Sequence, residues 1–338
     1  ALLAIVSLSY TQIIAAHPAG GGSYAVARAN LGINAGLVAA AALMIDYVLN
    51  VAVSVTAGVA AVSSAFPGLW PHRTVLSLAL LAIITLANLR GIREAGTVMT
   101  VPVYFFLCTY LVLIAVGLAR AAVEGPTPFP AVSPGPVAPV TPWLVLHAFA
   151  AGCTALTGVE AISNGVPVFT PPESKHANQT MAAMALLMGV LFLGTVGLTQ
   201  FFGVVAGPDE TILSALARRI VGGGAPYLLV QAATLLVLTV AANTSFMGFP
   251  RVASIIARDG YLPRQLTMLG ERLVYSNGIL LLAGLAALLI VIFQGDTHAL
   301  IPLFAVGAFL AFTLAQAGMG GPSRRPAGAG WRGQVAVP

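Results

Sequence analysis

Nine apolar runs occupy most of this chain, and they limit the folds that it can adopt. The runs cover about residues 1–16, 36–66, 74–89, 97–120, 142–169, 181–206, 226–248, 277–294 and 298–319. A transmembrane helix needs about 20 mainly apolar residues to cross roughly 30 Å of hydrocarbon. None of the runs alternates apolar and polar residues, as a membrane-spanning strand does. The pattern therefore predicts an all-α polytopic membrane protein.

The composition supports this class and argues against others. Hydrophobic residues make up 58% of the 338 residues and charged residues 7%, whereas a soluble domain carries about 25% charged residues. The net charge of +5 therefore concerns membrane orientation rather than nucleic acid. Cys108 and Cys153 both lie in apolar runs, which predicts small buried side chains and no disulfide framework. The sequence contains no metal-binding or nucleophile motif, so we expect neither an enzyme nor a cofactor.

The apolar runs place one transmembrane domain over residues 1–320. The tail 321–338 is rich in Gly, Pro and Arg, which predicts a disordered cytoplasmic segment. The chain begins without Met, inside an apolar run that has no charged leader. Residues 1–16 therefore do not read as a signal peptide, and we expect that a first part of the protein precedes them.

Basic residues are divided unequally between alternate connections, which predicts the orientation in the membrane. Eleven of the fifteen lie in the set expected to face the cytoplasm, namely Arg28, Arg90, Arg93, Lys175, Arg251, Arg258, Arg264, Arg272, Arg324, Arg325 and Arg332. The opposite set holds Arg73, Arg120, Arg218 and Arg219. We accordingly expect the Pro-rich connection 125–142 outside, and the long connection 249–275 inside. Residues 211–221 are expected to form a short amphipathic helix on the outer interface.

Two acidic residues, Asp46 and Glu160, lie well inside apolar runs. An ionisable group at membrane depth is costly, and by default it indicates a function. Function is the favoured interpretation for Glu160. For Asp46, which lies nearer the cytoplasmic end of its run, a carboxyl group satisfied by the backbone or kept protonated is equally compatible with the pattern.

The run 142–169 contains residues that interrupt a helix. Thr157 lies three residues before Glu160, on the same helical face. The residues that disfavour a continuing helix are Ser163, Asn164, Gly165 and Pro167. Broken helices occur at membrane depth where the freed backbone lines a cavity, and secondary transporters place substrate and ion sites there. Oxygen atoms of Thr157 and Glu160 suit a hard cation or a transported proton, whereas the alternative is a plain kink in a structural helix.

A polar stripe runs along the segment 36–66. Asp46, Asn50 and Ser54 are each four residues apart, so they share one helical face. The stripe either supplies neutral oxygen atoms that face Glu160 or forms polar contacts between membrane helices, and the sequence leaves these alternatives balanced. For a further polar group, Asn-Thr-Ser at 243–245, a contact between helices is the favoured interpretation, and a contribution to the lining of the site is the alternative.

A set of motifs carries a family resemblance. It includes NLRGIREAG, TALTGVEAISNGVPVF, FPRVASIIARDGYLPRQL and GDTHALIPLFAVGAF. Together they resemble the amino acid–polyamine–organocation (APC) transporter superfamily, most closely its KimA-type potassium uptake permeases, over about residues 1–320. The resemblance implies the leucine-transporter-type fold, with two inverted five-helix repeats whose first and sixth helices are broken. Run 1–16 is then the second family helix, 142–169 is the sixth, and the first is absent.

The resemblance also implies a site. Members of the potassium branch bind K⁺ between the first, third, sixth and tenth helices and couple its uptake to protons. The matching ligands here are Thr157, Glu160, Asn50 and Ser54, and the further candidates are Asp46, Ser163, Asn164 and Phe304. Asn50 stands where Thr is expected, and Phe304 stands where relatives often carry Tyr.

We therefore expect a secondary active transporter in a bacterial-type plasma membrane, with proton-coupled potassium uptake by alternating access as the leading hypothesis. The alternative is a proton-coupled amino acid permease of the same fold, in which backbone amides at a helix break hold the substrate carboxylate. Potassium and protons are then transported or coupling ions rather than cofactors. The expected partners are the small cation or amino acid and the lipid bilayer, without nucleic acid. The family's dimer contacts add a homodimer to these expectations.

Overall fold

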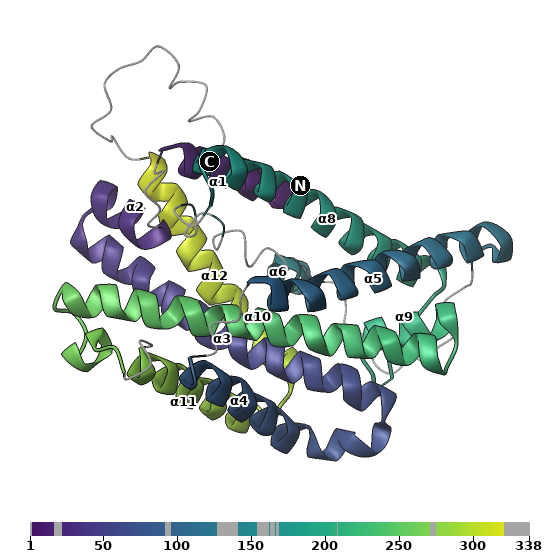
Figure 1. Ribbon diagram of the computed structural model, residues 1–338. Helices are drawn as coiled ribbons and strands as arrows, with labels where there is room; N and C mark the ends of the chain where they lie inside the picture. The colour runs from purple at the N-terminus through teal and green to yellow at the C-terminus, as the bar shows by residue number, and fades with distance from the viewer. Residues whose placement is uncertain are drawn as a thin grey trace, which may run out of the picture. The chain divides into compact units, whose positions relative to one another are not determined.

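The computed structural model of the chain is helical in every element that it describes (Figure 1). The described residues are 2–16, 22–91, 96–126, 141–153, 162, 166, 169–207, 209–270 and 275–320. They fall into two compact units, and three of the long helices begin in one unit and end in the other.

The larger unit comprises Tyr47–Val140 and Leu191–Ile301. Its elements are the C-terminal part of α3 (Ile33–Ala65), η1 (Pro67–His72), α4 (Arg73–Leu89), α5 (Gly96–Glu124), the end of α8 (Glu173–Phe201), α9 (Ile212–Val221), α10 (Ala225–Arg258), η4 (Arg264–Thr267), α11 (Ser276–Ile292) and the start of α12 (Thr297–Gly320). Helix α10 is the central element, because it packs against α4, α5, α9, α11 and η4. Helices α4 and α11 lie side by side (Figure 1).

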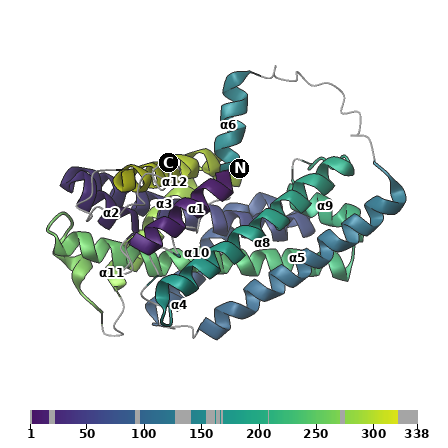
Figure 2. The ribbon, with the colours of Figure 1, turned by 90° about the horizontal axis from the view of Figure 1, so that it is seen from above.

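The ribbons of α5, α8, α9 and α10 can be followed in Figure 2. In this unit an apolar core joins these four helices. Two glycines permit the close packing, because a Cβ at Gly117 would lie 2.6 Å from Leu198 Cδ1 and one at Gly194 would lie 2.8 Å from Ile114 Cδ1. The amphipathic helix expected over 211–221 is present as α9. Leu216, Ala217 and Ile220 of this helix are buried in the core, so one face of α9 packs within the protein. Its place at the outer interface stays a prediction.

The smaller unit comprises Ala1–Asp46, Thr141–Val190 and Pro302–Pro338. It contains α1 (Leu2–Ala16), α2 (Gly22–Leu31), the start of α3, α6 (Pro142–Cys153), most of α8 and the rest of α12. Its core is formed by Tyr10, Ile14, Val166, Ala177 and Met181. Gly36 brings α2 against the start of α3, since a Cβ there would lie 2.7 Å from Arg28 Cβ.

The described helices agree with most of the predicted spans. Within the described residues, five stretches are long and apolar enough to cross a membrane, and these are Ile33–Ala65, Pro67–Leu89, Met99–Glu124, Glu173–Phe201 and Ala225–Arg258. Helices α1, α6, α11 and α12 occupy the remaining runs. Most of the run 142–169 beyond Cys153 lies outside the described residues. The helix break in that run, the inverted repeats and the missing first helix stay predictions.

Three expectations about individual segments are wrong. Helix α10 continues past the expected end at 248 to Arg258. Its additional turns bury a further apolar face. They can pack against α11 because Gly278 leaves room for Pro250: a Cβ at 278 would lie 2.8 Å from Pro250 Cβ. Helix α8 begins at Glu173 rather than near 181, since its first turns are polar and escape a search for apolar runs. Cys108 is exposed on α5 rather than buried.

Candidate functional site

Four of the predicted site residues lie in the described part of the chain. Asp46, Asn50 and Ser54 are on α3, and Phe304 is on α12. The other four, Thr157, Glu160, Ser163 and Asn164, lie outside the described residues. Asn50 and Ser54 belong to the larger unit, whereas Asp46 and Phe304 belong to the smaller one. The larger unit thus holds the neutral pair of the polar stripe, and the smaller unit holds its carboxyl group.

Asn50 is held by α10 through its side-chain amide. Its Nδ2 donates hydrogen bonds to the Ala241 carbonyl oxygen at 3.1 Å and to Ser245 Oγ at 2.8 Å. A carbonyl oxygen can only accept, so the amide atom that faces Ala241 is the nitrogen. The amide oxygen Oδ1 is consequently turned toward Ser54, whose Oγ donates to it at 3.4 Å.

Asn50 Oδ1 and Ser54 Oγ form a pair of neutral oxygen atoms one helical turn apart. Their separation of 3.4 Å is long for an O–H···O bond, which usually measures about 2.5–3.0 Å. A weak hydrogen bond of this kind leaves lone pairs on both oxygens. Ser54 is 5% exposed and Asn50 is half-buried, so the pair is partly shielded from solvent. Neutral oxygen dipoles in such surroundings are the groups that replace the hydration shell of K⁺ in selective proteins.

The polar residues 243–245 of α10 contact different neighbouring helices. Asn243 Oδ1 accepts a hydrogen bond from Asn88 of α4 at 2.6 Å, and Ser245 contacts Asn50 of α3. Thr244 is exposed and bonds only locally, to the Ala241 carbonyl at 2.7 Å. The expected helix contact is therefore present at two of the three positions. The specific pairing of Ser245 with Asn50 left no signal in the sequence beyond the polarity of both residues.

Asp46 and Phe304 are both buried in the smaller unit, with exposed fractions of 2% and 5%. Helix α12 packs against α3 at this level, where Gly307 lies beside Asp46. A Cβ at 307 would lie 3.5 Å from the backbone nitrogen of Asp46. The carboxyl group of the stripe therefore lies where α3 and α12 are packed together, one turn of α12 from Phe304.

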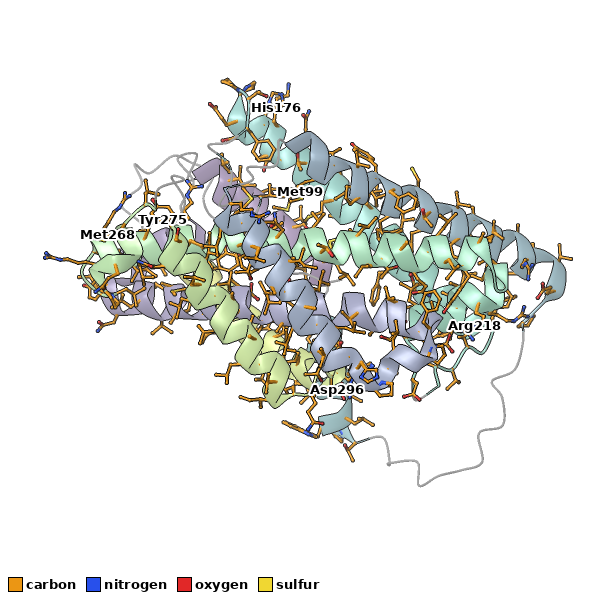
Figure 3. All side chains as sticks on the ribbon, turned by 60° about the horizontal axis from the view of Figure 1, so that its bottom comes forward. Met99, His176, Arg218, Met268, Tyr275 and Asp296 are labelled. Atoms are coloured by element: carbon orange, nitrogen blue, oxygen red, sulfur yellow. The ribbon has the colours of Figure 1, made fainter. Side chains whose placement is uncertain are left out.

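A second polar cluster lies where α9 meets the start of α10, around Arg218, which is labelled in Figure 3. We call it the Arg218 cluster, and its members are Ser64, Glu210, Ser214, Arg218 and Tyr227. Arg218 donates to the Ser64 carbonyl at 3.2 Å and to the Tyr227 hydroxyl at 3.1 Å, and it pairs with Glu210 at 3.1 Å. The Tyr227 hydroxyl donates to the Ser64 carbonyl at 3.1 Å. The hydrogen bond with Tyr227 raises the pKa of Arg218 above its ordinary value. The cluster fastens α9 to the ends of α3 and α10.

A metal centre built from ionisable ligands is not visible in the described ranges. No three His, Cys, Asp or Glu side chains gather there. The oxygen atoms that do gather, on α3 beside α10, belong to neutral side chains. Their chemistry favours a monovalent cation over a transition metal, which prefers nitrogen and sulfur ligands.

Comparison with known proteins gives the family. The family model described as "Amino acid permease" matches residues 1–319. The chain is also 44% identical, over 339 residues, to "Potassium transporter KimA" of Bacillus subtilis (strain 168), an alignment that covers 99% of this chain and 56% of the relative. The chain thus spans a little over half the length of that relative. It belongs to the amino acid permease family, a family of multi-pass membrane permeases rather than of enzymes.

Proposed function

We propose that the protein takes up potassium by alternating access and couples this uptake to protons. The observation that carries the proposal is the orientation of Asn50, whose amide hydrogens are used by α10 so that its oxygen joins Ser54 in a neutral pair. Such a pair presents oxygen lone pairs to a cation. Its one donor, the Ser54 hydroxyl, is directed at Asn50 Oδ1. The likeness to a relative named as a potassium transporter supports the same ion.

In this proposal, Thr157, Asn50 and Ser54 supply neutral oxygen ligands, and Glu160 binds the ion or carries the proton. Asn50 replaces the Thr expected from the family but still presents one oxygen, so the ligand count is unchanged. Phe304 has no hydroxyl and adds no ligand. Asp46, Ser163 and Asn164 are the further candidates, and the helix break in 142–169 would form the movable wall of the site.

The alternative, a proton-coupled amino acid permease, is favoured by the match to the amino acid permease family. An amino acid brings a carboxylate, which must be held by free N–H groups such as those at a helix break. On α3 the side-chain N–H groups of Asn50 already donate to Ala241 and Ser245. This part of the site therefore suits a cation better than a carboxylate.

Growth of a bacterial strain that lacks its own potassium-uptake systems tests the proposal. The protein as its gene encodes it should restore growth at low potassium, and Glu160→Gln, which keeps the side-chain volume but removes the charge, should abolish this rescue. Glu173→Gln is the matched control, because Glu173 lies in the first turn of α8 outside the proposed site. Uptake of a labelled amino acid without any potassium rescue would overturn the proposal.

Proton coupling needs a separate measurement in vesicles. With the membrane potential held at zero, an inward proton gradient should drive potassium accumulation, and a protonophore should stop it. Potassium accumulation that is indifferent to the proton gradient would leave the uptake activity standing and refute the coupling.

A further inference from the structure

We infer that Ser245 of α10 is a positioning residue for the potassium site, because its hydroxyl fixes the side-chain amide of Asn50 with the oxygen toward the ion. The inference rests on the proposed function and extends it to a residue that would not touch the ion. It assigns to α10 the task of orienting a ligand that α3 carries.

The inference begins with the number of donors and acceptors. The Asn50 amide nitrogen has two hydrogens, and α10 offers it two oxygen atoms, the Ala241 carbonyl at 3.1 Å and Ser245 Oγ at 2.8 Å. Residues 241 and 245 are four positions apart and lie on one face of the helix. Each amide hydrogen therefore has its own acceptor, and only one orientation of the amide satisfies both.

Burial makes this orientation matter. Ser245 is 0% exposed, so bulk water does not reach its hydroxyl. A buried N–H group without an acceptor is costly. After loss of the hydroxyl, the amide keeps only the Ala241 carbonyl as a partner on α10, and rotation about its last torsion becomes easier because terminal amide torsions are broad. The oxygen Oδ1 would then spend less time facing Ser54 and the ion.

The surroundings hold α10 firmly at this level. A Cβ at Gly248 would lie 2.6 Å from Tyr47 Cζ, so this glycine lets the Tyr47 ring of α3 pack directly on α10 one turn from Ser245. On the neighbouring side, Asn88 of α4 donates to Asn243 at 2.6 Å. The distance between α3 and α10 is thereby set by packing, and the Ser245 hydroxyl can act on the orientation of Asn50 without also having to hold the helices together.

Potassium and rubidium uptake by membrane-inserted variants of the protein, as its gene encodes it, tests the inference. Ser245→Ala should raise the KM for potassium roughly threefold to tenfold, the effect of one net hydrogen bond, and should change the preference for potassium over rubidium. The maximal rate per inserted molecule should stay close to that of the unsubstituted protein. Ser245→Thr retains the hydroxyl and should restore the original KM and preference.

Two controls separate positioning from general damage. Ser254→Ala makes the same substitution at a buried serine of α10 that bonds only locally, to the Arg251 carbonyl, and it should leave the KM unchanged. In an Asn50→Thr background the amide is absent, so Ser245→Ala should have no further effect on the KM. An equal KM increase in both backgrounds would overturn the inference.

The remaining outcomes are also decisive. If Ser245→Ala reaches the membrane with an unchanged KM and ion preference, Ser245 is only a packing residue and the inference is overturned. If Ser245→Ala does not accumulate, Ser245→Cys, whose sulfur is a weak acceptor of similar size, should show an intermediate KM increase, and an unchanged KM would again overturn the inference. Absence of potassium-dependent uptake in the unsubstituted protein would overturn the proposed function itself.

Discussion

Helices α3 and α10 meet at two polar clusters that use their hydrogen-bonding groups differently. In the Arg218 cluster, the charged guanidinium, the Tyr227 hydroxyl and Glu210 face one another, and the Ser64 carbonyl receives two donors. The second cluster consists of Asn50, Ser54, Ala241 and Ser245, and we call it the Asn50 cluster. Here the Asn50 amide nitrogen donates to Ala241 and Ser245, while the oxygens of Asn50 and Ser54 share one long hydrogen bond.

The difference shows that polarity inside a membrane protein does not by itself mark a ligand site. Buried polar groups are normally satisfied, and the Arg218 cluster follows that rule with matched charges and donors. In the Asn50 cluster, both amide hydrogens of Asn50 have an acceptor. The oxygens of Asn50 and Ser54, in contrast, have only one long hydrogen bond between them. A cation site therefore differs from a structural contact between helices in one feature. Its oxygen atoms keep free lone pairs, and hydrogen bonds from the same side chain fix the direction of those lone pairs.

The largest effect should follow from removing the oxygen of the Asn50 cluster. Asn50→Leu keeps a similar side-chain volume but loses both the ligand and the amide. Uptake at limiting potassium should fall by roughly 10- to 100-fold, the range expected for loss of a polar contact to a charge. The free energy of unfolding in detergent without potassium should also fall, by about 1–3 kcal/mol, because Ser245 and the Ala241 carbonyl lose their donor. The loss of uptake is therefore the result that identifies a ligand. Near-normal uptake by Asn50→Leu would show that the Asn50 cluster, like the Arg218 cluster, only holds helices together.

For the Arg218 cluster we expect a loss of stability without a change in uptake. Tyr227→Phe removes the hydroxyl that binds Ser64 and Arg218, and we expect the free energy of unfolding to fall by about 1–3 kcal/mol because buried partners lose a hydrogen bond. The KM for potassium should not change. Calorimetry and uptake of the same preparation check this, and a KM increase without loss of stability would reverse the roles of the two clusters.

A smaller effect should follow from a satisfied contact that lies close to the site in sequence. Thr297 at the start of α12 donates to Thr56 Oγ1 at 3.1 Å, two residues from Ser54. Thr297→Val should lower the free energy of unfolding by about 1 kcal/mol and leave the KM nearly unchanged, since Thr56 also donates to the Ala52 carbonyl. A KM increase as large as that of Ser245→Ala would show that potassium binding depends on any polar contact near Ser54, rather than on the direction of the Asn50 oxygen.

The smallest effect is expected at a solvent-facing ion pair. Arg120 and Glu124 are 3.8 Å apart and both well exposed, and Arg219 contacts the same carboxylate at 2.8 Å. Arg120→Ala should therefore change stability by less than about 0.5 kcal/mol and leave uptake unaltered. A larger loss in a thermal-unfolding assay would mean that charge networks at this end contribute more than their exposure indicates.

The sequence predicted the helices well, because long apolar runs have few alternatives in a bilayer. It failed where a helix is held by packing rather than by apolar composition, as at the polar first turns of α8 and at the end of α10 beyond Pro250. The extension of α10 depends on Gly278 of α11, a residue distant in sequence. A search along the chain has no access to such a contact.

The candidate site was predictable only in part. The spacing of Asn50 and Ser54 placed both on one face, and the structure confirms that they are adjacent. The orientation of the Asn50 amide depends on Ser245 and the Ala241 carbonyl, which lie 195 and 191 positions away, and no local pattern contains that information. The positions of Thr157 and Glu160 stay predictions.

The most direct measurement is the thermal stability of the purified protein in equal concentrations of potassium, sodium and choline chloride. A ligand that binds the folded state raises the unfolding temperature by mass action. We predict that potassium raises it above sodium and choline in the unsubstituted protein and in Tyr227→Phe, but not in Asn50→Leu. The same increase in Asn50→Leu, or identical curves in all three salts for the unsubstituted protein, would contradict a potassium site at the oxygens of α3.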